Sequence, residues 1–271
     1  MPMSDARVQH AVQFRALHAG PELLVLPNAW DAGSARVIEH AGARAIATSS
    51  AAVAWGHGYP DGQALPLDTV LATVRAMVRV VGVPVSADIE AAYAQDGATA
   101  ATTASRVIDA GAVGINVEDG RDAPDLLCEK IERIKSAAAR AGVDLWVNAR
   151  TDVYLRGLVP APQAIAETIE RSRRYRAAGA DSVFVPGLIE ERDIARLVAE
   201  VPVPLNVLAW PGLPSAPALE RLGVRRLSAG TAVAQAAYNR AHEAARNFLG
   251  AGAQSAAAFT TGDLNALMRR D

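Results

Sequence analysis

Charged side chains stand at the ends of three successive apolar segments of this chain. The segments are Val85–Glu90, Ile115–Asp119 and Val147–Asp152. If they form parallel strands that lie side by side, their carboxylates gather at one edge and repel one another unless a cation joins them. Hard divalent cations bind oxygen ligands of this kind. The spacing therefore predicts an enzyme in which carboxylates hold a metal ion.

Strand-like apolar segments alternate with segments of helical apolar spacing along the whole chain. The strands are expected at Leu23–Ala29, Ala43–Ser50, Val83–Glu90, Val113–Asp119, Asp144–Asp152, Asp181–Gly187, Pro204–Ala209 and Arg225–Gly230. The helices between them are expected at Ala32–Ala41, Leu67–Val80, Ala98–Ala110, Leu126–Ala141, Ala161–Ala178, Glu190–Val201 and Ala216–Leu222. Five of these helices run into a glycine, which favours the left-handed conformation of a helix end. Repeated βα units predict an α/β fold, a closed (β/α)8 TIM barrel, with a doubly wound open sheet as the alternative.

Helical segments also lie outside the eight units. Asp5–Ala19 precedes the first strand, and Ala232–Leu249 and Ala256–Arg270 follow the last. No linker divides the chain, so residues 1–271 are expected to form a single barrel domain. The C-terminal extension, residues 232–271, has no place inside a complete barrel, and we expect it to pack on a neighbouring subunit.

Composition, net charge and cysteine content exclude several classes of protein. About half of the 271 residues are apolar (51%), enough for a large core, and the net charge of −2 gives no electrostatic reason to bind nucleic acid or an anionic membrane. Cys128 is the only cysteine, which excludes an internal disulfide and fits a reducing compartment. Neither a signal peptide nor a membrane span is expected, so the predicted location is the cytoplasm.

In barrels of this kind the catalytic residues lie at the carboxyl ends of the strands, and this rule selects one set of charged residues. Asp88 and Glu90 are two residues apart, so on a strand both side chains point to the same face. A solvated strand end would explain each charge alone, but not their coincidence at three neighbouring strand ends. The set predicted to converge is Asp88, Glu90, Glu118, Asp119, Arg150 and Asp152.

The chain resembles the isocitrate lyase/phosphoenolpyruvate (PEP) mutase superfamily, as a PEP phosphonomutase-like protein, from about Leu26 to Gly230. Ser86–Glu90 matches its Asp-x-Asp/Glu metal motif, Val117–Asp119 its Glu-Asp strand end and Ala149–Asp152 its Ala-Arg-Thr-Asp strand. Three further segments resemble its first strand, its carboxylate-binding loop and its Gly-x-Pro-Asp turn. These segments are Leu26–Asp31, Ala47–Ala51 and Gly58–Gly62.

The resemblance implies a role for each matching residue. Asp88 would ligate Mg²⁺ directly, with Mn²⁺ as an alternative ion, while Glu90, Glu118 and Asp61 hold its waters. Arg150 would bind the substrate carboxylate or the oxygen that becomes an enolate. The implied catalytic group is therefore Arg150, Asp61 and Glu118. The implied substrate-binding group is Ser49, Ser50, Ala51, Asp88, Arg150 and Asn206, with Asn206 dependent on the register of its strand.

The chain departs from the superfamily after the fourth strand. The lyases carry a Lys-Lys-Cys-Gly-His type loop there, whereas Gly120–Leu126 has no Cys, His or Lys, and the gating Lys of the phosphonate enzymes is also missing. Cys128 lies in a helical pattern that favours a structural thiol. Arg121 is a candidate to bind the distal carboxylate of a diacid, and His57 is a candidate proton donor. For each of them, a solvated loop residue is the alternative interpretation. Tyr59, Tyr154, Trp210 and the turn Ser228–Thr231 are further candidates for a pocket wall or an anion site.

The sequence thus supports a Mg²⁺-dependent enzyme acting on a small 2-oxo or 2-hydroxy (di)carboxylic acid. It would cleave a C–C bond through an enolate-type intermediate, as a carbon-carbon lyase or a decarboxylase-like enzyme. The alternatives are a phosphonopyruvate-type C–P mutase or hydrolase, and a non-catalytic 2-oxo acid binder. The superfamily resemblance further implies a homo-oligomer, a tetramer built from dimers that exchange a C-terminal helix.

Overall fold

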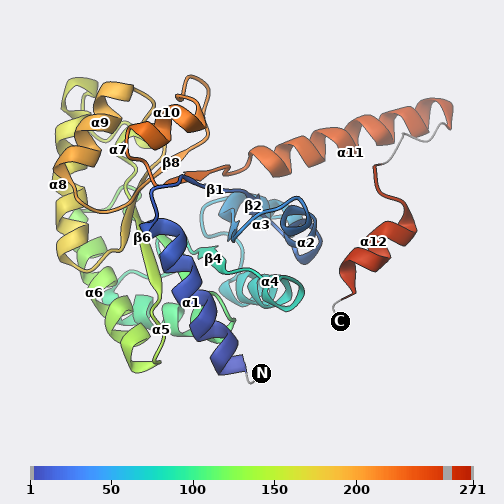
Figure 1. Ribbon diagram of the computed structural model, residues 1–271, viewed down its shortest axis with the longest axis horizontal. Coiled ribbons are helices and arrows are strands. Elements are labelled where there is room, and N and C mark those ends of the chain that lie inside the picture. Colours follow the sequence, from blue (N-terminus) through green and yellow to red (C-terminus); the bar gives the residue numbers. More distant parts are fainter. Residues whose placement is uncertain (1–2, 253–257, 270–271) are drawn as a thin grey trace.

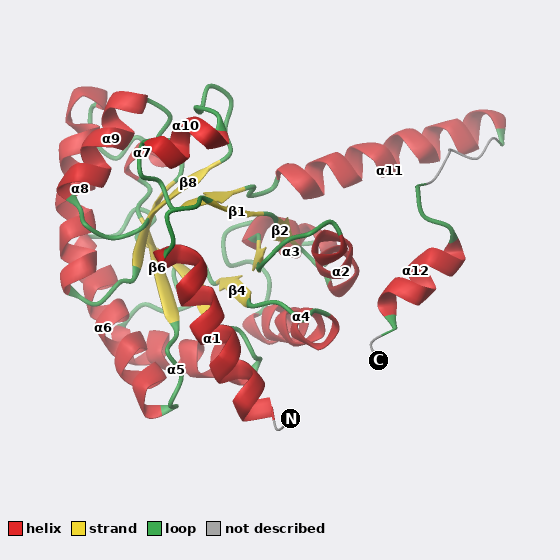
Figure 2. Cartoon of the chain, in the orientation of Figure 1, coloured by secondary structure: helices red, strands yellow, loops and turns green. Residues whose placement is uncertain are grey.

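The computed structural model describes residues 3–252 and 258–269. Its parallel strands close into a barrel, and helices surround the strands on the outside (Figures 1 and 2). From β2 to β9 each strand pairs with the next along the chain, and β9 also pairs with β1. The bounds are β1 Leu24–Leu26, β2 Asn28–Ala29, β3 Ile46–Thr48, β4 Val85–Asp88, β5 Gly114–Glu118, β6 Trp146–Arg150, β7 Ser182–Val185, β8 Leu205–Leu208 and β9 Arg226–Ser228.

β1 and β2 together occupy one strand position of the barrel. They are separated only by Pro27, which has no N–H to donate to a neighbouring strand. β1 pairs with β9 on one side, and β2 pairs with β3 on the other. The barrel therefore has the eight strand positions that the sequence predicts, and each predicted strand contains the observed one. The (β/α)8 architecture is confirmed, and the open doubly wound sheet is not found.

Helices follow the strands in the predicted order. They are α2 Ala32–His40, α4 Leu67–Val80, α5 Gly97–Asp109, α6 Pro124–Arg140, α8 Ala161–Ala177, α9 Glu191–Glu200 and α10 Ala216–Arg221. The glycine stops behave as expected: Gly111, for example, adopts φ +97° directly after α5 and its C-cap residue. Two short helices were not predicted, α3 Ser50–Gly56 and α7 Val153–Arg156. Each begins within three residues of a strand end and so borders the face where chemistry is expected.

Successive side chains of each strand point alternately out of the barrel and into it, so the barrel has an outer and an inner packing region. In β5, Ile115 and Val117 point outward into an apolar cluster that includes Ile131 and Ile134 of α6. Asn116, between them, points inward. The layer between strands and helices therefore supplies the apolar core, whereas the inside of the barrel carries polar side chains.

Helix α1 (Met3–Ala19) closes the floor of the barrel. Phe14 lies so close to β5 that a Cβ added to Gly114 would stand 2.6 Å from the Phe14 ring. His18 is 1% exposed and stacks on Trp146 of β6 with 4.2 Å between ring centroids. The close approach of Phe14 explains why glycine occupies the first position of β5.

The C-terminal helices lie apart from the barrel. α11 (Ala232–Ala251) extends away from it in Figure 1, and Leu249 near its end is 85% exposed. α12 (Thr261–Met268) returns to α2, where Arg36 Nε donates to the carbonyl oxygen of Leu267 at 2.8 Å. The predicted helix 256–270 thus corresponds to α12, with residues 256, 257 and 270 outside the described part.

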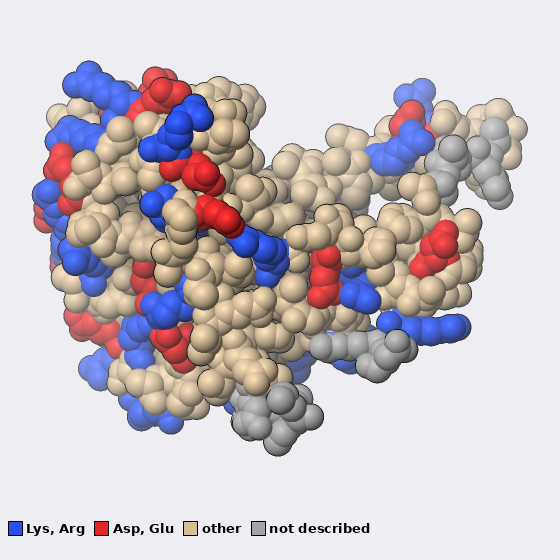
Figure 3. Space-filling model, in the orientation of Figure 1, with Lys and Arg blue, Asp and Glu red and all other residues tan. Residues whose placement is uncertain are grey.

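The surface and the helices show two further properties. On the face drawn in Figure 3, basic and acidic side chains are interspersed over the outer helices of the barrel. Within residues 3–252 and 258–269, no helix combines the length and the apolar character needed to cross a bilayer.

Candidate active site

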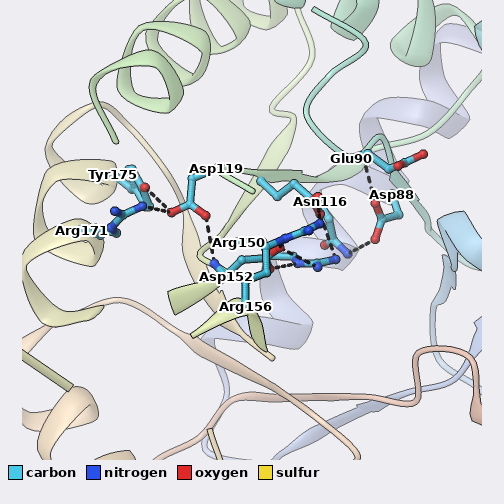
Figure 4. A network of polar contacts seen from close by, with 10 residues as sticks. Asp88, Glu90, Asn116, Asp119, Arg150, Asp152, Arg156, Arg171 and Tyr175 are labelled. Atoms are coloured by element: carbon cyan, nitrogen blue, oxygen red, sulfur yellow. Dashed lines mark hydrogen bonds and ion pairs between the residues drawn. The ribbon is translucent and has the colours of Figure 1, made fainter. Parts of the chain in front are cut away.

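The carboxyl ends of β4, β5 and β6 bring the predicted charges together (Figure 4). Asp88 at the end of β4 lies beside Asn116 of β5, and Glu118 at the end of β5 lies beside Arg150 of β6. Because the three strands are parallel and in register, residues 28 to 62 positions apart in the sequence meet at one edge of the barrel. The predicted cluster of charges is therefore a feature of the structure.

Asp88 is the most enclosed carboxylate of this edge. Its backbone N–H donates to Thr48 Oγ1 at 2.7 Å, while its side chain accepts from Glu90 N at 3.1 Å and from Asn116 Nδ2 at 3.2 Å. Burial raises the pKa of Asp88, and Arg150 acts in the opposite direction. The protein thus holds Asp88 in a fixed orientation at a position where a negative charge is costly.

A chain of hydrogen bonds links Asp88 to the floor of the barrel. Trp146 Nε1 donates to Ser182 Oγ at 2.8 Å, and Ser182 Oγ donates to Asn148 Oδ1 at 2.7 Å. Asn148 Nδ2 then donates to Asn116 Oδ1 at 2.8 Å, and Asn116 in turn donates to Asp88. This polar interior fixes the side chain that orients Asp88.

Glu90 follows β4 in an unusual backbone conformation. Glu90, Ala92 and Tyr93 have φ values of 51°, 68° and 51°, a region that residues other than glycine rarely adopt. The turn points the Glu90 carboxylate toward the loop before α4, where it accepts from Gln63 N at 2.7 Å. Burial, followed by the charge of Asp88, raises the pKa of Glu90 to about 7. Backbone strain and an unfavourable charge thus coincide here, as they commonly do at functional sites.

Arg150 is enclosed by carboxylates. Its Nη1 lies 2.9 Å from Glu118 Oε2, and its Nε donates to Asp152 Oδ1 at 2.7 Å. Burial raises the pKa of Glu118 to about 8, although Arg150 opposes the shift. Burial by itself would lower the pKa of Arg150, but Glu118 and Asp152 raise it above its ordinary value. Arg150 is therefore a permanently charged group held in place from two sides.

Asp119 faces away from this cluster, toward α8 (Figure 4). Its carboxylate accepts from Tyr175 Oη at 2.6 Å, from Arg171 Nη1 at 2.9 Å and from Asp152 N at 2.9 Å. Asp119 thus joins the ends of β5 and β6 to the outer helix layer and supports the position of Arg150 through Asp152. Its predicted convergence with the other charges is correct in location, but its side chain has a positioning role.

Two neighbouring cavities open at this edge, and Ser50, Asp61 and Arg150 line both of them. The first has a volume of about 260 Å³ and is mainly polar. Its other lining residues include Gln63, Glu90, Glu118, Asp119, Arg121, Asp122 and Arg156. The second has a volume of about 250 Å³ and is lined in part by Asn28, Ser49, Ala51, Asp88, Asn116, Leu155, Phe184, Pro186, Leu208, Trp210, Ser228 and Thr231. We call them the polar cavity and the mixed cavity.

Most of the predicted site residues border these cavities, including Asp61, Asp88, Glu90, Glu118 and Arg150. Ser49, Ser50 and Ala51, which the resemblance assigns to carboxylate binding, line the mixed cavity, and Ser49 caps α3 by accepting from Ala52 N at 3.4 Å. Arg121 lines the polar cavity, and Trp210 and Ser228 line the mixed cavity.

Other candidates lie elsewhere. Asn206 is fully buried inside the barrel, where its Oδ1 accepts from Ser228 Oγ at 3.1 Å, and it lines neither cavity. The structure therefore does not bring Asn206 to the expected substrate position. His57 Nε2 lies 2.9 Å from Thr73 Oγ1, and Tyr154 Oη donates to Asp193 at 2.9 Å, so both take part in packing contacts outside the cavities. Cys128 lies on α6, where burial raises the pKa of its thiol.

Two arginines were not predicted, one that lines the site and one buried beneath it. Arg156 on α7 lines the polar cavity and donates to Asp152 Oδ2 at 2.6 Å. Arg226 is wholly buried inside the barrel, where its Nε donates to Ser228 Oγ at 3.1 Å and burial lowers its pKa to about 9. The sequence did indicate that Arg226 points into the barrel, because it directly precedes Leu227, an apolar residue that faces outward in a predicted strand.

The donor set fits a hard divalent cation. Asp61 and Asp88 add negative charge around Glu90, and the raised pKa values at Asp88, Glu90 and Glu118 reflect the burial of more carboxylates than Arg150 can balance. Among the residues described, no three His, Cys, Asp or Glu side chains are grouped closely enough to hold an ion by themselves. A cation that binds one carboxylate directly and reaches others through water, as Mg²⁺ commonly does, matches this arrangement.

The fold and the site together define an α/β-barrel protein with an acidic centre at the carboxyl ends of its strands. The chain belongs to the phosphoenolpyruvate phosphomutase family, whose model matches residues 14–249. This places it in the PEP mutase/isocitrate lyase superfamily and confirms the resemblance drawn from the motifs.

Named relatives show how varied the family is. An uncharacterized protein of Mycobacterium tuberculosis (strain H37Rv) is 36% identical over 240 residues, which cover 87% of this chain and 88% of that protein. The 2-methylisocitrate lyase of Escherichia coli K12 is 30% identical over 216 residues, 74% of this chain and 71% of that enzyme. Relatives that cleave C–C bonds thus stand beside relatives of unknown activity.

Solved structures show the same fold. A candidate lyase/mutase from Burkholderia cenocepacia J2315 is 36% identical and superposes with a TM-score of 0.89, covering 97% of this chain and 96% of that one. Phosphonopyruvate hydrolase in complex with oxalate and Mg²⁺ superposes with a TM-score of 0.85 over 95% of this chain and 94% of that one, at 24% identity. The second likeness concerns the fold alone.

Proposed function

We propose that this protein is a Mg²⁺-dependent enzyme that cleaves a C–C bond of a small 2-oxo or 2-hydroxy carboxylic acid. The observation that carries the proposal is the position of Arg150, which lies 2.9 Å from Glu118 and borders both cavities together with Ser50 and Asp61. A fixed guanidinium beside surplus carboxylates suits an anionic substrate that binds together with a cation. The 2-methylisocitrate lyase among the relatives supports this class of reaction.

The residues of the chain have distinct roles in this proposal. Asp88 would hold Mg²⁺ directly, and Glu90, Glu118 and Asp61 would hold its waters; the bound ion would supply positive charge to the oxygens of the substrate. Arg150 donates hydrogen bonds to the oxygen on which negative charge develops. The N–H groups at the start of α3, next to Ser49, bind the substrate carboxylate. Glu118 and Asp152 keep Arg150 from turning away.

The test is an assay of 2-oxo and 2-hydroxy acids for release of pyruvate or CO₂, with Mg²⁺ and with a chelator. We expect turnover only with the ion, and loss of both turnover and Mg²⁺-dependent thermal stabilisation in Asp88→Asn. Asp109→Asn, at an exposed position at the end of α5, is the matched control and should behave as the wild type. Activity that survives the chelator or Asp88→Asn would contradict the proposal. Tight binding of 2-oxo acids without turnover would instead support a non-catalytic binder.

Phosphonate chemistry is the second candidate, and one observation favours it. Arg121 and Arg156 line the polar cavity and could receive a phosphoryl group there, although Arg156 is already paired with Asp152. Phosphorus NMR of phosphonopyruvate incubated with the protein and Mg²⁺ tests this activity. An unchanged phosphorus spectrum would exclude phosphonate chemistry.

We also propose that the chain forms a homo-oligomer through α11. Among the described residues of this helix only Ala234 is buried, while Tyr238, Phe248 and Leu249 are exposed. A helix with so little buried surface of its own gains stability by packing on another subunit. Light scattering should show a dimer or a tetramer, and a monomer at micromolar concentration would contradict this part of the proposal.

A further inference from the structure

The mixed cavity has two chemically different sides. The side formed by Ser49, Asp88 and Arg150 carries the polar groups that the proposed function assigns to the oxo acid. A second group of lining side chains is apolar and comes from three separate segments of the chain. They are Leu155 on α7, Phe184 and Pro186 at the end of β7, and Leu208 and Trp210 at and after the end of β8. An oxo acid held at the polar side would direct the rest of its carbon chain toward this apolar wall.

Close backbone approaches hold the wall in place. Gly187, with φ +84°, lies against α7, where a Cβ would stand 3.4 Å from the backbone nitrogen of Leu155. Gly230, with φ +59°, lies under Leu208, whose Cδ1 would stand 2.7 Å from a Cβ at that position. The guanidinium of Arg150 lies 5.9 Å from the centre of the Phe184 ring. The apolar side is therefore a formed surface that touches the polar side at Arg150.

Two large apolar side chains at the rim remain accessible. Leu155 is 38% exposed and Trp210 is 47% exposed, although both border the cavity. Exposed apolar surface that lines a concave site is typical of a place where a ligand completes the packing.

The charges that line the mixed cavity disfavour a second anionic group beside the apolar side chains. Arg150 is the only Lys or Arg among the described residues that line the mixed cavity, and Asp61 and Asp88 line it as well. The turn after β9 offers little to an anion, because Gly230 N donates to Asn28 Oδ1 at 2.8 Å and Ser228 Oγ donates to Asn206. A second carboxylate here would lose water without gaining a cation.

We propose that the substrate is a 2-oxo or 2-hydroxy acid with an uncharged, apolar side chain, and that Leu155 and Trp210 determine this specificity. This inference rests on the proposed function and narrows its substrate class. It predicts that monocarboxylic acids with an alkyl tail bind better than dicarboxylic acids of the same length.

The test is calorimetric binding to the full chain in the presence of Mg²⁺. The probes are oxalate, pyruvate, 2-oxobutanoate, 2-oxopentanoate and 2-oxoglutarate, the last being 2-oxopentanoate with a terminal carboxylate. We expect affinity to rise about fourfold for each added methylene, and 2-oxoglutarate to bind at least about tenfold more weakly than 2-oxopentanoate. Equal or tighter binding of 2-oxoglutarate, or no dependence on chain length, would overturn the inference.

Substitutions of Leu155 and Trp210 test whether these two side chains cause the preference for alkyl chains. Leu155→Ala and Trp210→Ala should flatten the chain-length series and leave the affinity for oxalate within about twofold, because both side chains are apolar and oxalate has no carbon chain for them to contact. Leu155→Arg should restore binding of 2-oxoglutarate. Tyr59→Ala, at an exposed aromatic residue that lines neither cavity, should keep the wild-type series.

The outcomes separate the two proposals. If oxalate and pyruvate bind with Mg²⁺ but the series is flat, the inference on the tail fails while the proposed function stands. If no oxo acid and no oxalate binds, both fail. A wild-type series in Trp210→Ala and Leu155→Ala would remove these residues as the determinants of specificity.

Discussion

His18 at the floor of the barrel should make the protein sensitive to mild acid. Its Nδ1 lies 2.8 Å from the Phe14 carbonyl oxygen, its Nε2 has no partner, and it is 1% exposed. Burial, together with the nearby positive charges of Arg226 and Arg15, lowers the pKa of His18 from 6.5 to about 3, although the Phe14 carbonyl opposes the shift. The folded protein therefore keeps this imidazole neutral at a pH where the unfolded chain protonates it.

The sign and size follow from proton linkage. Between about pH 6.5 and pH 3 the unfolded state binds more protons at His18 than the folded state, so stability falls as the pH falls. From pH 7 to pH 5 the loss amounts to about 2 kcal/mol. At pH 5 this figure depends on the ordinary pKa of histidine and hardly on how far below pH 4 the folded pKa lies.

Urea unfolding of the wild type and of His18→Gln at pH 7 and pH 5 measures the effect. His18→Gln will itself change stability, but the wild type should lose about 2 kcal/mol more than the variant between the two pH values. Subtracting the stability change of the variant from that of the wild type removes the contribution of the other titrating groups. His242→Gln, at an exposed histidine of α11, is the matched control. An equal loss in wild type and His18→Gln would refute the buried neutral imidazole.

Three further predictions concern the site and its supports. Arg150→Lys should lower kcat/KM about 100-fold, because lysine cannot pair with Glu118 and Asp152 at once, while Mg²⁺-dependent thermal stabilisation persists. Asp119→Asn should cost about 2 kcal/mol in urea unfolding, because Arg171 on α8 loses one of its two carboxylate partners and keeps only Glu167; a cost under about 0.5 kcal/mol would contradict this. Gly114→Ala should cost about 1–3 kcal/mol through contact with Phe14, and Phe14→Leu should recover part of it in the double variant.

The secondary-structure elements of the barrel could be predicted because they depend on local patterns. Each strand is a short apolar run and each long helix has a regular apolar period, so burial on one side is visible in neighbouring residues. The helices α3 and α7 were missed for the same reason. α3 has seven residues, three of them alanine, and α7 has only four, too few to show a period. α7 supplies Leu155 and Arg156, so two parts of the site were missed with it.

The sequence by itself determined the repeated βα order, the glycine stops and the motifs that place Asp88, Glu118 and Arg150 at neighbouring strand ends. These features are local, and parallel register then brings the strand ends together. Only the tertiary structure decided which way each side chain points and what it meets. It placed Asn206 beneath the site, paired Arg150 with its carboxylates and assembled an apolar wall from segments that are far apart in the sequence. Such contacts depend on the closure of the barrel, and no stretch of neighbouring residues records them.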